Sequence, residues 1–396
     1  MRLLSQRFLS ELLLRIIFWI LTLVIPKKKD LIVFSQSQYF DNSKFLFEWM
    51  IINSPHQIYW LLHKDCRIPL EISVSAKNFV PLYSLRGLWM TLRARVVVIS
   101  YSLADFGYFK HIIKHAIVVH LWHGITIKCV GLLNRRFNTR KKEKFLRRET
   151  NYFDMIIASS DIDRYMTASY QGLSIDQVHV TGLPRNDYLI TNRLNYTLQA
   201  ERESGVRNVL YAPTFRDYRE GHCSLFFPFI DYDEISLVKF LRVNKIHLFL
   251  RPHRLDRFST EHTHTLANKY EDVIKSLTAD VLPDVNEKLP TIDIVISDYS
   301  SIYADLLLND IPCIFIPFDI EKYQRLRGIA YDYDSITPGP KVNTQADLLA
   351  ALSAALTGMP AWKQHREIVR KIFHKNTDGG SCKRISLLID DVIYEN

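Results

Sequence analysis

Short, uninterrupted apolar runs recur along the chain, and each is followed by a helical or turn-rich stretch. Strands that are buried on both faces show such continuous runs, whereas a one-sided sheet shows alternation. The pattern therefore predicts parallel sheets with crossover helices. The expected strands are 31–35, 58–62, 96–100, 116–121, 155–159, 178–180, 208–212, 245–250, 292–297 and 313–316.

These strands form two series, and the polar stretch 188–207 between them lacks a buried strand. A chain of 396 residues is long enough for two domains with separate cores. We therefore predict an α/β protein in which two Rossmann-like, doubly wound domains face each other across a cleft. Their ranges are 30–187 and 188–396, and a membrane-associating segment, 1–29, precedes them.

The net charge of +9 is concentrated in basic runs, among them 27–29 and 140–148. Such runs favour acidic lipid head groups, phosphate-bearing polymers or nucleic acid, although any single run can also be a solvated helix face. No zinc pattern, RNA-binding signature or helix-turn-helix pattern accompanies them, so no nucleic-acid partner is expected. Five scattered cysteines indicate neither disulfides nor a metal site and fit a reducing compartment.

The segment 9–25 is strongly apolar, but Glu11 and Arg15 interrupt it. The uncharged run after Arg15 is roughly half of the ~20 residues that a spanning helix needs. We expect a helix that lies in the membrane interface, with Arg15 and the lysines at 27–29 near anionic head groups on the cytoplasmic face. A spanning anchor and packing on the protein's own surface are the alternatives. No small-residue cleavage site suggests a signal peptide.

Polar residues gather after the expected strands, where ligands bind in open parallel sheets. Trp122, His123 and Gly124 follow 116–121, and Lys128 comes shortly after. His123 has the chemistry of a general base, Gly124 permits a close backbone approach, and Lys128 suits a phosphate. A structural histidine beside a turn glycine is the alternative.

A second polar group follows 245–250. Arg251 and Arg254 flank Pro252 and His253 there, and guanidinium groups match phosphate oxygens well. The alternative is a charged surface turn.

The third group lies between 292–297 and an expected helix, 302–309. Ser300 and Ser301 offer hydroxyls and backbone N–H groups to an anion, although they also suit helix capping. Asp298 precedes them at a place that suits a ribose or polyol hydroxyl. Thr214 and Arg185 follow two other strands and offer a hydroxyl and a basic side chain, with turns as the alternative.

Other chemistries fit the sequence less well. It contains no Walker-type loop, no G-x-G-x-x-G after a strand and no G-x-S-x-G elbow. His111 and His115 are four residues apart, but no carboxylate accompanies them, so no metal site is expected.

Several segments, in order, resemble the CDP-glycerol glycerophosphotransferase family, whose members build teichoic-acid and capsule polymers. The segments are LWHGITIKCVG, FDMIIASSDIDRYMTASY with VTGLPRNDYL, LYAPTFRD, LRPH, DIVISDYSSIYADLLLNDIPCIFIPFDIEKYQRLRG and YDYDSITPGP. The resemblance covers roughly residue 31 to the C-terminus, and the stretch from DYSS to TPGP is its most specific part.

The resemblance implies a GT-B-like fold and the transfer of glycerol phosphate, or a related polyol phosphate, from CDP-glycerol to a lipid-linked primer or a growing polymer. It implies that the C-terminal domain binds the donor and that no cofactor or metal is needed. His123 and His253 would be catalytic. The residues expected at the donor phosphates are Arg185, Thr214, Arg251, Asp298, Tyr299, Ser300 and Ser301, and those on the acceptor side are Trp122, Gly124 and Lys128.

Two departures concern the identity of donor and acceptor. The family commonly has threonine directly after His-Gly, whereas this chain has Ile125 before Thr126. The family often has proline after the second histidine, where this chain has Arg254. A GT-B glycosyltransferase that uses a sugar nucleotide, and a non-catalytic scaffold that binds anionic polymer through 140–148, are the competing hypotheses. The sequence does not separate glycerol from ribitol phosphate, primase from polymerase, or teichoic acid from capsule.

Overall fold

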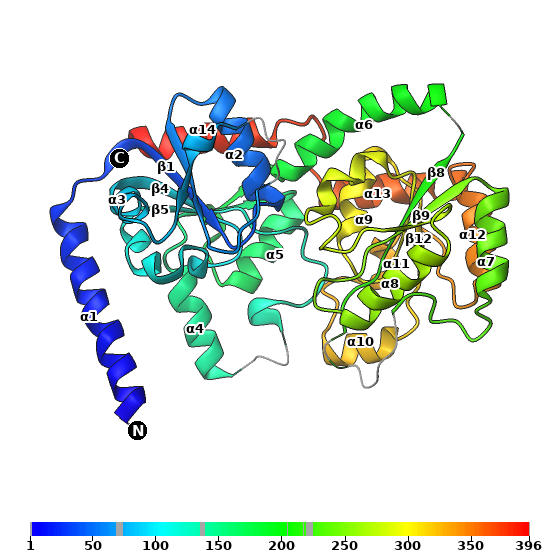
Figure 1. Ribbon diagram of the computed structural model, residues 1–396, viewed down its shortest axis with the longest axis horizontal. Coiled ribbons are helices and arrows are strands. Elements are labelled where there is room, and N and C mark those ends of the chain that lie inside the picture. The colour runs from blue at the N-terminus through cyan, green and yellow to red at the C-terminus, as the bar shows by residue number, and fades with distance from the viewer. Residues whose placement is uncertain are drawn as a thin grey trace.

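The computed structural model describes residues 2–68, 74–134, 139–203, 205–216, 218 and 225–395. Two parallel sheets flanked by helices form its core (Figure 1). The strands of the first sheet are β1 (Lys28–Gln36), β2 (Gln57–Leu62), β3 (Phe79–Pro81), β4 (Ala94–Ile99), β5 (Ile117–His120), β6 (Met155–Ala158) and β7 (Val178–Val180). Those of the second are β8 (Arg207–Ala212), β9 (Ile246–Leu250), β10 (Ile274–Ser276), β11 (Ile294–Ser297) and β12 (Cys313–Phe315).

Helices connect and cover these strands. They are α1 (Arg2–Val24), α2 (Asp41–Asn53), α3 (Leu85–Arg93), α4 (Arg140–Thr150), α5 (Asp161–Gln171), α6 (Pro184–Glu203), α7 (Glu234–Val243), α8 (Arg257–Lys269), α9 (Ile302–Leu306), α10 (Ile320–Leu326), α11 (Tyr333–Ile336), α12 (Gln345–Ala355), α13 (Lys363–Phe373) and α14 (Ser381–Glu395). A 3-10 segment, η2 (Leu103–His111), follows β4.

Every expected strand is present, and all pairings between neighbouring strands are parallel. All residues of β6, β11 and β12 are buried, which is the two-sided burial that their apolar runs predict. The α/β fold with parallel sheets is thus confirmed. The sequence analysis missed β3 and β10, which are three-residue edge strands with only one buried residue each and therefore leave no continuous apolar run.

Both sheets have the same winding. The first has the order β3-β2-β1-β4-β5-β6-β7 and the second the order β10-β9-β8-β11-β12. In each sheet the first three strands are added toward one edge, and the later strands are added toward the other edge. The strand order therefore reverses between β1 and β4 in the first sheet and between β8 and β11 in the second. Loops beyond the carboxyl ends of strands at such a switch point form the usual ligand site.

Helix α6 connects the two sheets, and the domain boundary that we placed after Asp187 falls in its first turn. The chain then returns at its end, because α14 packs on α2 and α6, and His56 Nε2 lies 2.6 Å from Asp390 Oδ1. Cys382, Ile385 and Ile389 are buried at helical spacing along α14. Segment 188–396, predicted as one C-terminal domain, therefore ends against the first sheet.

Helix α1 extends away from the first sheet (Figure 1). From residue 13 onward, where its side chains are described, Phe18 is 8% exposed, whereas Leu13 and Leu23 are 60% and 63% exposed. Glu11 lies outside the described side chains. No helix among the described residues is both long enough and apolar enough to cross a membrane.

Candidate active site

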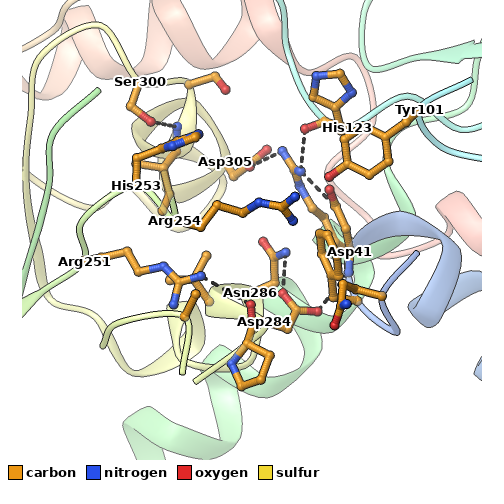
Figure 2. A pocket seen from close by; sticks show the side chains of 18 of the residues that line it. Asp41, Tyr101, His123, Arg251, His253, Arg254, Asp284, Asn286, Ser300 and Asp305 are labelled. Carbon is orange, nitrogen blue, oxygen red and sulfur yellow. Dashed lines mark hydrogen bonds and ion pairs between the residues drawn. The ribbon is translucent and has the colours of Figure 1, made fainter. Parts of the chain in front are cut away.

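A cavity of about 660 Å³ lies where the two switch points meet. Its walls follow the carboxyl ends of β1, β4 and β5 on one side and of β9, β10 and β11 on the other. His123 and His253, the two predicted catalytic histidines, both line it and stand on opposite sides in Figure 2. The structure thus brings together residues that are far apart in the sequence.

The loop after β5 holds His123 in place. Trp122 and Gly124 on either side have φ values of 51° and 134°. The Asn42 side chain at the start of α2 donates hydrogen bonds to the carbonyls of Leu121 and Trp122, at 3.2 and 3.1 Å. These bonds fix a sharp turn that presents the imidazole at the cavity wall. The sequence analysis missed Asn42, which no local pattern connects to this loop.

The His123 ring stacks on Tyr101, with ring centroids 4.9 Å apart, and packs at a tilt against Trp122, with centroids 4.1 Å apart. The ring is exposed to the cavity, and the protein groups packed around it replace part of its shell of water. This desolvation lowers the pKa of His123 to about 4, although the nearby Asp41 carboxylate favours the charged form. The imidazole is therefore neutral at pH 7 and able to accept a proton.

Arg185 joins the two halves of the site. One terminal nitrogen, Nη1, donates to Asp41 Oδ1 and to the His123 carbonyl, both at 2.9 Å. The other, Nη2, donates to Asp305 Oδ2 of α9 at 2.6 Å. Arg185 lines the cavity, as its predicted phosphate-binding role requires, but two carboxylates already balance its charge.

Gly124 makes room for this arrangement. A Cβ atom at position 124 would lie 2.6 Å from Arg185 Nη2. The sequence predicted that Gly124 permits a close approach to a ligand, whereas the structure shows that it permits the close approach of Arg185.

The loop after β9 presents His253, whose ring stacks on Phe215 with centroids 5.3 Å apart. The Leu255 N–H donates to His253 Nδ1 at 3.3 Å, so the neutral ring carries its proton on Nε2. Desolvation by the surrounding protein and the charge of Lys128 lower the pKa of His253 to about 4. This imidazole is therefore a hydrogen-bond donor at neutral pH.

The two arginines of this loop have different surroundings. Arg251 Nη1 donates to the carbonyls of Leu277 and Leu282, both at 2.6 Å, and Nη2 donates to Pro283 at 3.2 Å. Arg251 therefore shapes the loop after β10, although it also lines the cavity. Arg254 instead reaches into the middle of the cavity (Figure 2) and makes no hydrogen bond or ion pair within the part of the chain that the structure describes.

Arg254 is thus better placed than Arg251 to bind a phosphate directly. The sequence signal was present in the Arg-Pro-His-Arg run, but the run does not show which guanidinium turns toward the carbonyls.

Ser300 and Ser301 line the cavity, and Ser301 also borders a smaller hollow of about 120 Å³ beside Trp122, Gly124 and Lys128. Ser301 makes no side-chain capping bond, and Ser300 Oγ accepts only a long bond, 3.5 Å, from the Ile302 N–H. Capping therefore leaves both hydroxyls largely available to a ligand.

Lys128 lies where the loop after β5 meets the second half of the chain. The Cys129 N–H donates to the Gly328 carbonyl at 3.0 Å, and the Ala330 N–H donates to the Ile127 carbonyl at 2.8 Å. Burial lowers the pKa of Lys128 to about 8, against the opposing effect of Asp298.

Asp298, Tyr299 and Thr214 are not part of the cavity lining; they form a buried network around Arg216. The Thr214 N–H donates to Asp298 Oδ1 at 2.9 Å, and Arg216 Nη1 donates to Asp298 Oδ2 at 2.8 Å. The Tyr299 hydroxyl and Arg216 Nη2 both donate to Asp319 Oδ1, at 3.0 and 2.9 Å. This network supports the loops that carry Ser300. The sequence suggests a charge pair of Arg216 with its neighbour at 217, whereas the structure pairs Arg216 with Asp298 and Asp319, which are distant in the sequence.

Within the described residues, no three histidine, cysteine, aspartate or glutamate side chains are grouped so that they could hold a metal ion.

Comparisons with known proteins agree with the motifs. The sequence profile of the CDP-glycerol:poly(glycerophosphate) glycerophosphotransferase family matches residues 17–390. A teichoic acid glycerol-phosphate transferase of Staphylococcus aureus is 27% identical over 386 residues, which cover 90% of this chain and 92% of that protein. A teichoic acid poly(glycerol phosphate) polymerase of Bacillus subtilis is 26% identical over 352 residues, which cover 83% of this chain and 44% of that protein.

The structure of the wall teichoic acid polymerase TagF has a TM-score of 0.76 against this chain at 22% identity, covering 93% of this chain and 90% of that one. This likeness confirms the GT-B-like fold, and the profile match confirms the resemblance read from the motifs.

Proposed function

Because the chain belongs to the CDP-glycerol:poly(glycerophosphate) glycerophosphotransferase family, we propose that it transfers glycerol phosphate, or a related polyol phosphate, from a CDP-linked donor to a teichoic acid polymer or its lipid-linked primer. The observation that carries the proposal is the shared cavity, in which two neutral imidazoles that follow strands of different sheets accompany Arg254, whose guanidinium has no partner among the described residues. Segment 30–187 would present the acceptor, and 188–396 would bind the CDP donor.

His123 would act as the general base. The acceptor hydroxyl gives its proton to the neutral ring as its oxygen attacks the phosphorus that carries the glycerol. The bond from that phosphorus to the bridging oxygen breaks, and CMP leaves with the electron pair. A positioned base of this kind contributes about 10²–10⁴-fold to the rate.

The second half of the cavity would stabilise the charge that develops on the diphosphate. His253 Nε2–H, the Ser300 and Ser301 hydroxyls and the Arg254 guanidinium are the donors that support this role. Arg251 holds the neighbouring loop, and the pairs that Arg185 forms with Asp41 and Asp305 hold the two halves in register.

Transfer can be tested with the purified chain, a synthetic lipid-linked disaccharide acceptor and, in separate reactions, CDP-glycerol, CDP-ribitol and UDP-sugars. We expect CMP release and an acceptor heavier by one or more polyol phosphate units. We expect His123→Gln to lose this activity by about 10²–10⁴-fold while it still binds CDP-glycerol. His115→Gln, an exposed histidine, is the matched control. Release of UDP in place of CMP would identify a glycosyltransferase instead.

We further propose that α1 lies in the interface of an anionic membrane on its cytoplasmic face. Its exposed apolar side chains, among them Ile17 and Ile20, support this placement. The lysines at 27–29 do not add to it, because Lys27 Nζ is buried, Lys28 lies near Asp30 and Lys29 lies over the Tyr394 ring. Co-sedimentation with phosphatidylglycerol vesicles should weaken in the double variant Ile17→Glu, Ile20→Glu. Equal sedimentation of variant and wild type would contradict the proposal.

A further inference from the structure

A second hollow, of about 300 Å³, lies between α1 and η2, outside the site described above. We refer to it as the α1–η2 groove. Its lining is mostly apolar: Leu14 and Phe18 come from α1, and Ala104, Gly107 and Tyr108 come from η2. Lys110 lies at its border and supplies a positive charge.

Aromatic packing gives the groove a firm floor. Phe18 is 8% exposed and meets Phe109 edge to face, with ring centroids 5.9 Å apart. Tyr83 packs against Phe109 and Tyr108, at 5.6 and 5.7 Å. Gly107 has φ +54°, and a Cβ there would lie 2.0 Å from the Tyr83 hydroxyl, so only glycine leaves this wall intact. The groove is therefore a feature of the folded body and not only a gap beneath α1.

The start of η2 and the residues just before it also border the active-site cavity. Tyr101 and Asp105 line that cavity, whereas Ala104 and Tyr108 line the groove. Asp105 fixes the turn by accepting hydrogen bonds from the N–H groups of Ser100 and Tyr101, at 3.0 and 2.9 Å. Consecutive residues, Ala104 and Asp105, thus border two different cavities. The groove and the active-site cavity therefore lie on either side of one short segment of the chain.

The surroundings favour a tail that arrives from a lipid layer. Ile16 and Trp19 of α1 are 47% and 55% exposed, and Tyr108 is 66% exposed at the groove itself. An exposed apolar surface of this kind on a folded protein indicates contact with an apolar partner. The ammonium group of Lys110 suits the phosphate that joins such a tail to its head.

We propose that the α1–η2 groove binds the first part of the hydrocarbon chain of a lipid-linked acceptor, with the linking phosphate beside Lys110. This inference rests on the proposed transfer reaction to a lipid-linked primer, and it adds the place on this chain where the hydrocarbon tail of such an acceptor binds. The groove then contributes to binding of the acceptor, not to chemistry.

The test uses the full chain and two acceptors that share one head group, one with a long isoprenoid chain and one with a butyl group. Ala104→Phe fills the groove from an exposed position, and Ala350→Phe on the surface of α12 is the matched control. We expect Ala104→Phe to raise KM for the long-chain acceptor about tenfold, which corresponds to about two methylene groups left in water. KM for the butyl acceptor and for CDP-glycerol should not change. Equal effects on both acceptors, or none on either, would overturn the inference.

A direct binding measurement separates this inference from the proposed function. A fluorescent twelve-carbon alkyl phosphate, below its micelle concentration, should bind the wild type and the Ala350→Phe control more tightly than Ala104→Phe or Lys110→Glu. Lys110→Glu reverses a charge without filling the groove, so it tests the site even if Ala104→Phe folds poorly. Equal binding by all four proteins would overturn the inference even if transfer is observed. If the wild type and Ala350→Phe bind the alkyl phosphate more tightly than the two groove variants but no transfer is observed, the proposed function is overturned and the groove remains a lipid-binding site.

Discussion

At the scale of single residues, His123 and His253 have pKa values that are lowered by the same cause, although the two residues follow strands of different sheets. Desolvation lowers the pKa of each ring to about 4, so each is neutral at pH 7. A neutral ring can accept a proton or donate one hydrogen bond, and these are the two roles that transfer to a hydroxyl requires. Their neighbours then differ: the Asp41 carboxylate favours the protonated form of His123, whereas the Leu255 N–H occupies Nδ1 of His253 and leaves its proton on Nε2.

The pH dependence of the reaction follows from this setting. The basic form of His123 exists above its pKa and is lost only as the pH falls through about 4. An unperturbed histidine, with a pKa near 6.5, would lose about tenfold of its basic form by pH 5.5. We expect kcat/KM for the acceptor to show no such loss from His123 between pH 7.5 and 5.5.

Asp105 needs a control in this profile, because burial raises its pKa to about 6 and it lines the same cavity. An inflection near pH 6 that disappears in Asp105→Asn would belong to Asp105. An inflection near 6.5 that persists in that variant would contradict a His123 pKa of about 4.

Arg254 provides a second prediction at this scale. Its guanidinium reaches into the cavity without a partner among the described residues, so a donor phosphate can bind it without breaking another contact. A hydrogen bond to a charged group contributes about 1.5–3 kcal/mol. We therefore expect Arg254→Ala to raise KM for CDP-glycerol by about 10–100-fold, and Arg254→Lys to recover part of the loss.

The control is Arg242→Ala, which removes an exposed arginine paired with Asp272 on the surface. Steady-state CMP release gives both constants. If Arg254→Ala leaves KM for CDP-glycerol unchanged and raises KM for the acceptor, Arg254 binds the acceptor and not the donor.

At the scale of elements, the loop after β5 is held by steric fit. Gly124 combines φ +134° with a Cβ direction that points at Arg185 Nη2. Gly124→Ala should therefore lower the free energy of unfolding by about 2–4 kcal/mol, from backbone strain and overpacking together. Gly358→Ala, at φ +82° with no atom within 4 Å of the new Cβ, should show only the backbone part. Similar losses in the two variants, measured by denaturant unfolding, would show that the contact with Arg185 matters little.

The elements also show what the sequence could and could not predict. Most strands were predictable because two-sided burial leaves a continuous apolar run in the sequence. The loops that carry the site residues were predictable as well, because they begin where those runs end. The partners of the side chains were not predictable. Arg251 turns toward carbonyls at 277–283 and Arg185 toward Asp41 and Asp305, and these partners become neighbours only after both sheets have formed.

At the scale of the whole molecule, the cavity depends on links that cross between the halves of the chain. Helix α14 packs on α2 and α6, the 127–130 loop pairs with 328–330, and Arg185 connects Asp41 with Asp305. The first two links are apolar packing and backbone hydrogen bonds. The third is a buried ion-pair group, which stabilises little in total but costs much when one member is removed.

Arg185→Met should therefore lower the free energy of unfolding by about 3–5 kcal/mol, because two buried carboxylates lose their counter-ion. The triple variant that adds Asp41→Asn and Asp305→Asn should recover most of this stability without recovering transfer, since neutral groups can pack together but no longer fix the position of His123. Denaturant unfolding and CMP release measure the two effects separately. If Arg185→Met instead unfolds like the wild type and loses only CDP-glycerol binding, Arg185 is a direct ligand of the donor, as its sequence motif suggests, and the link between the halves lies elsewhere.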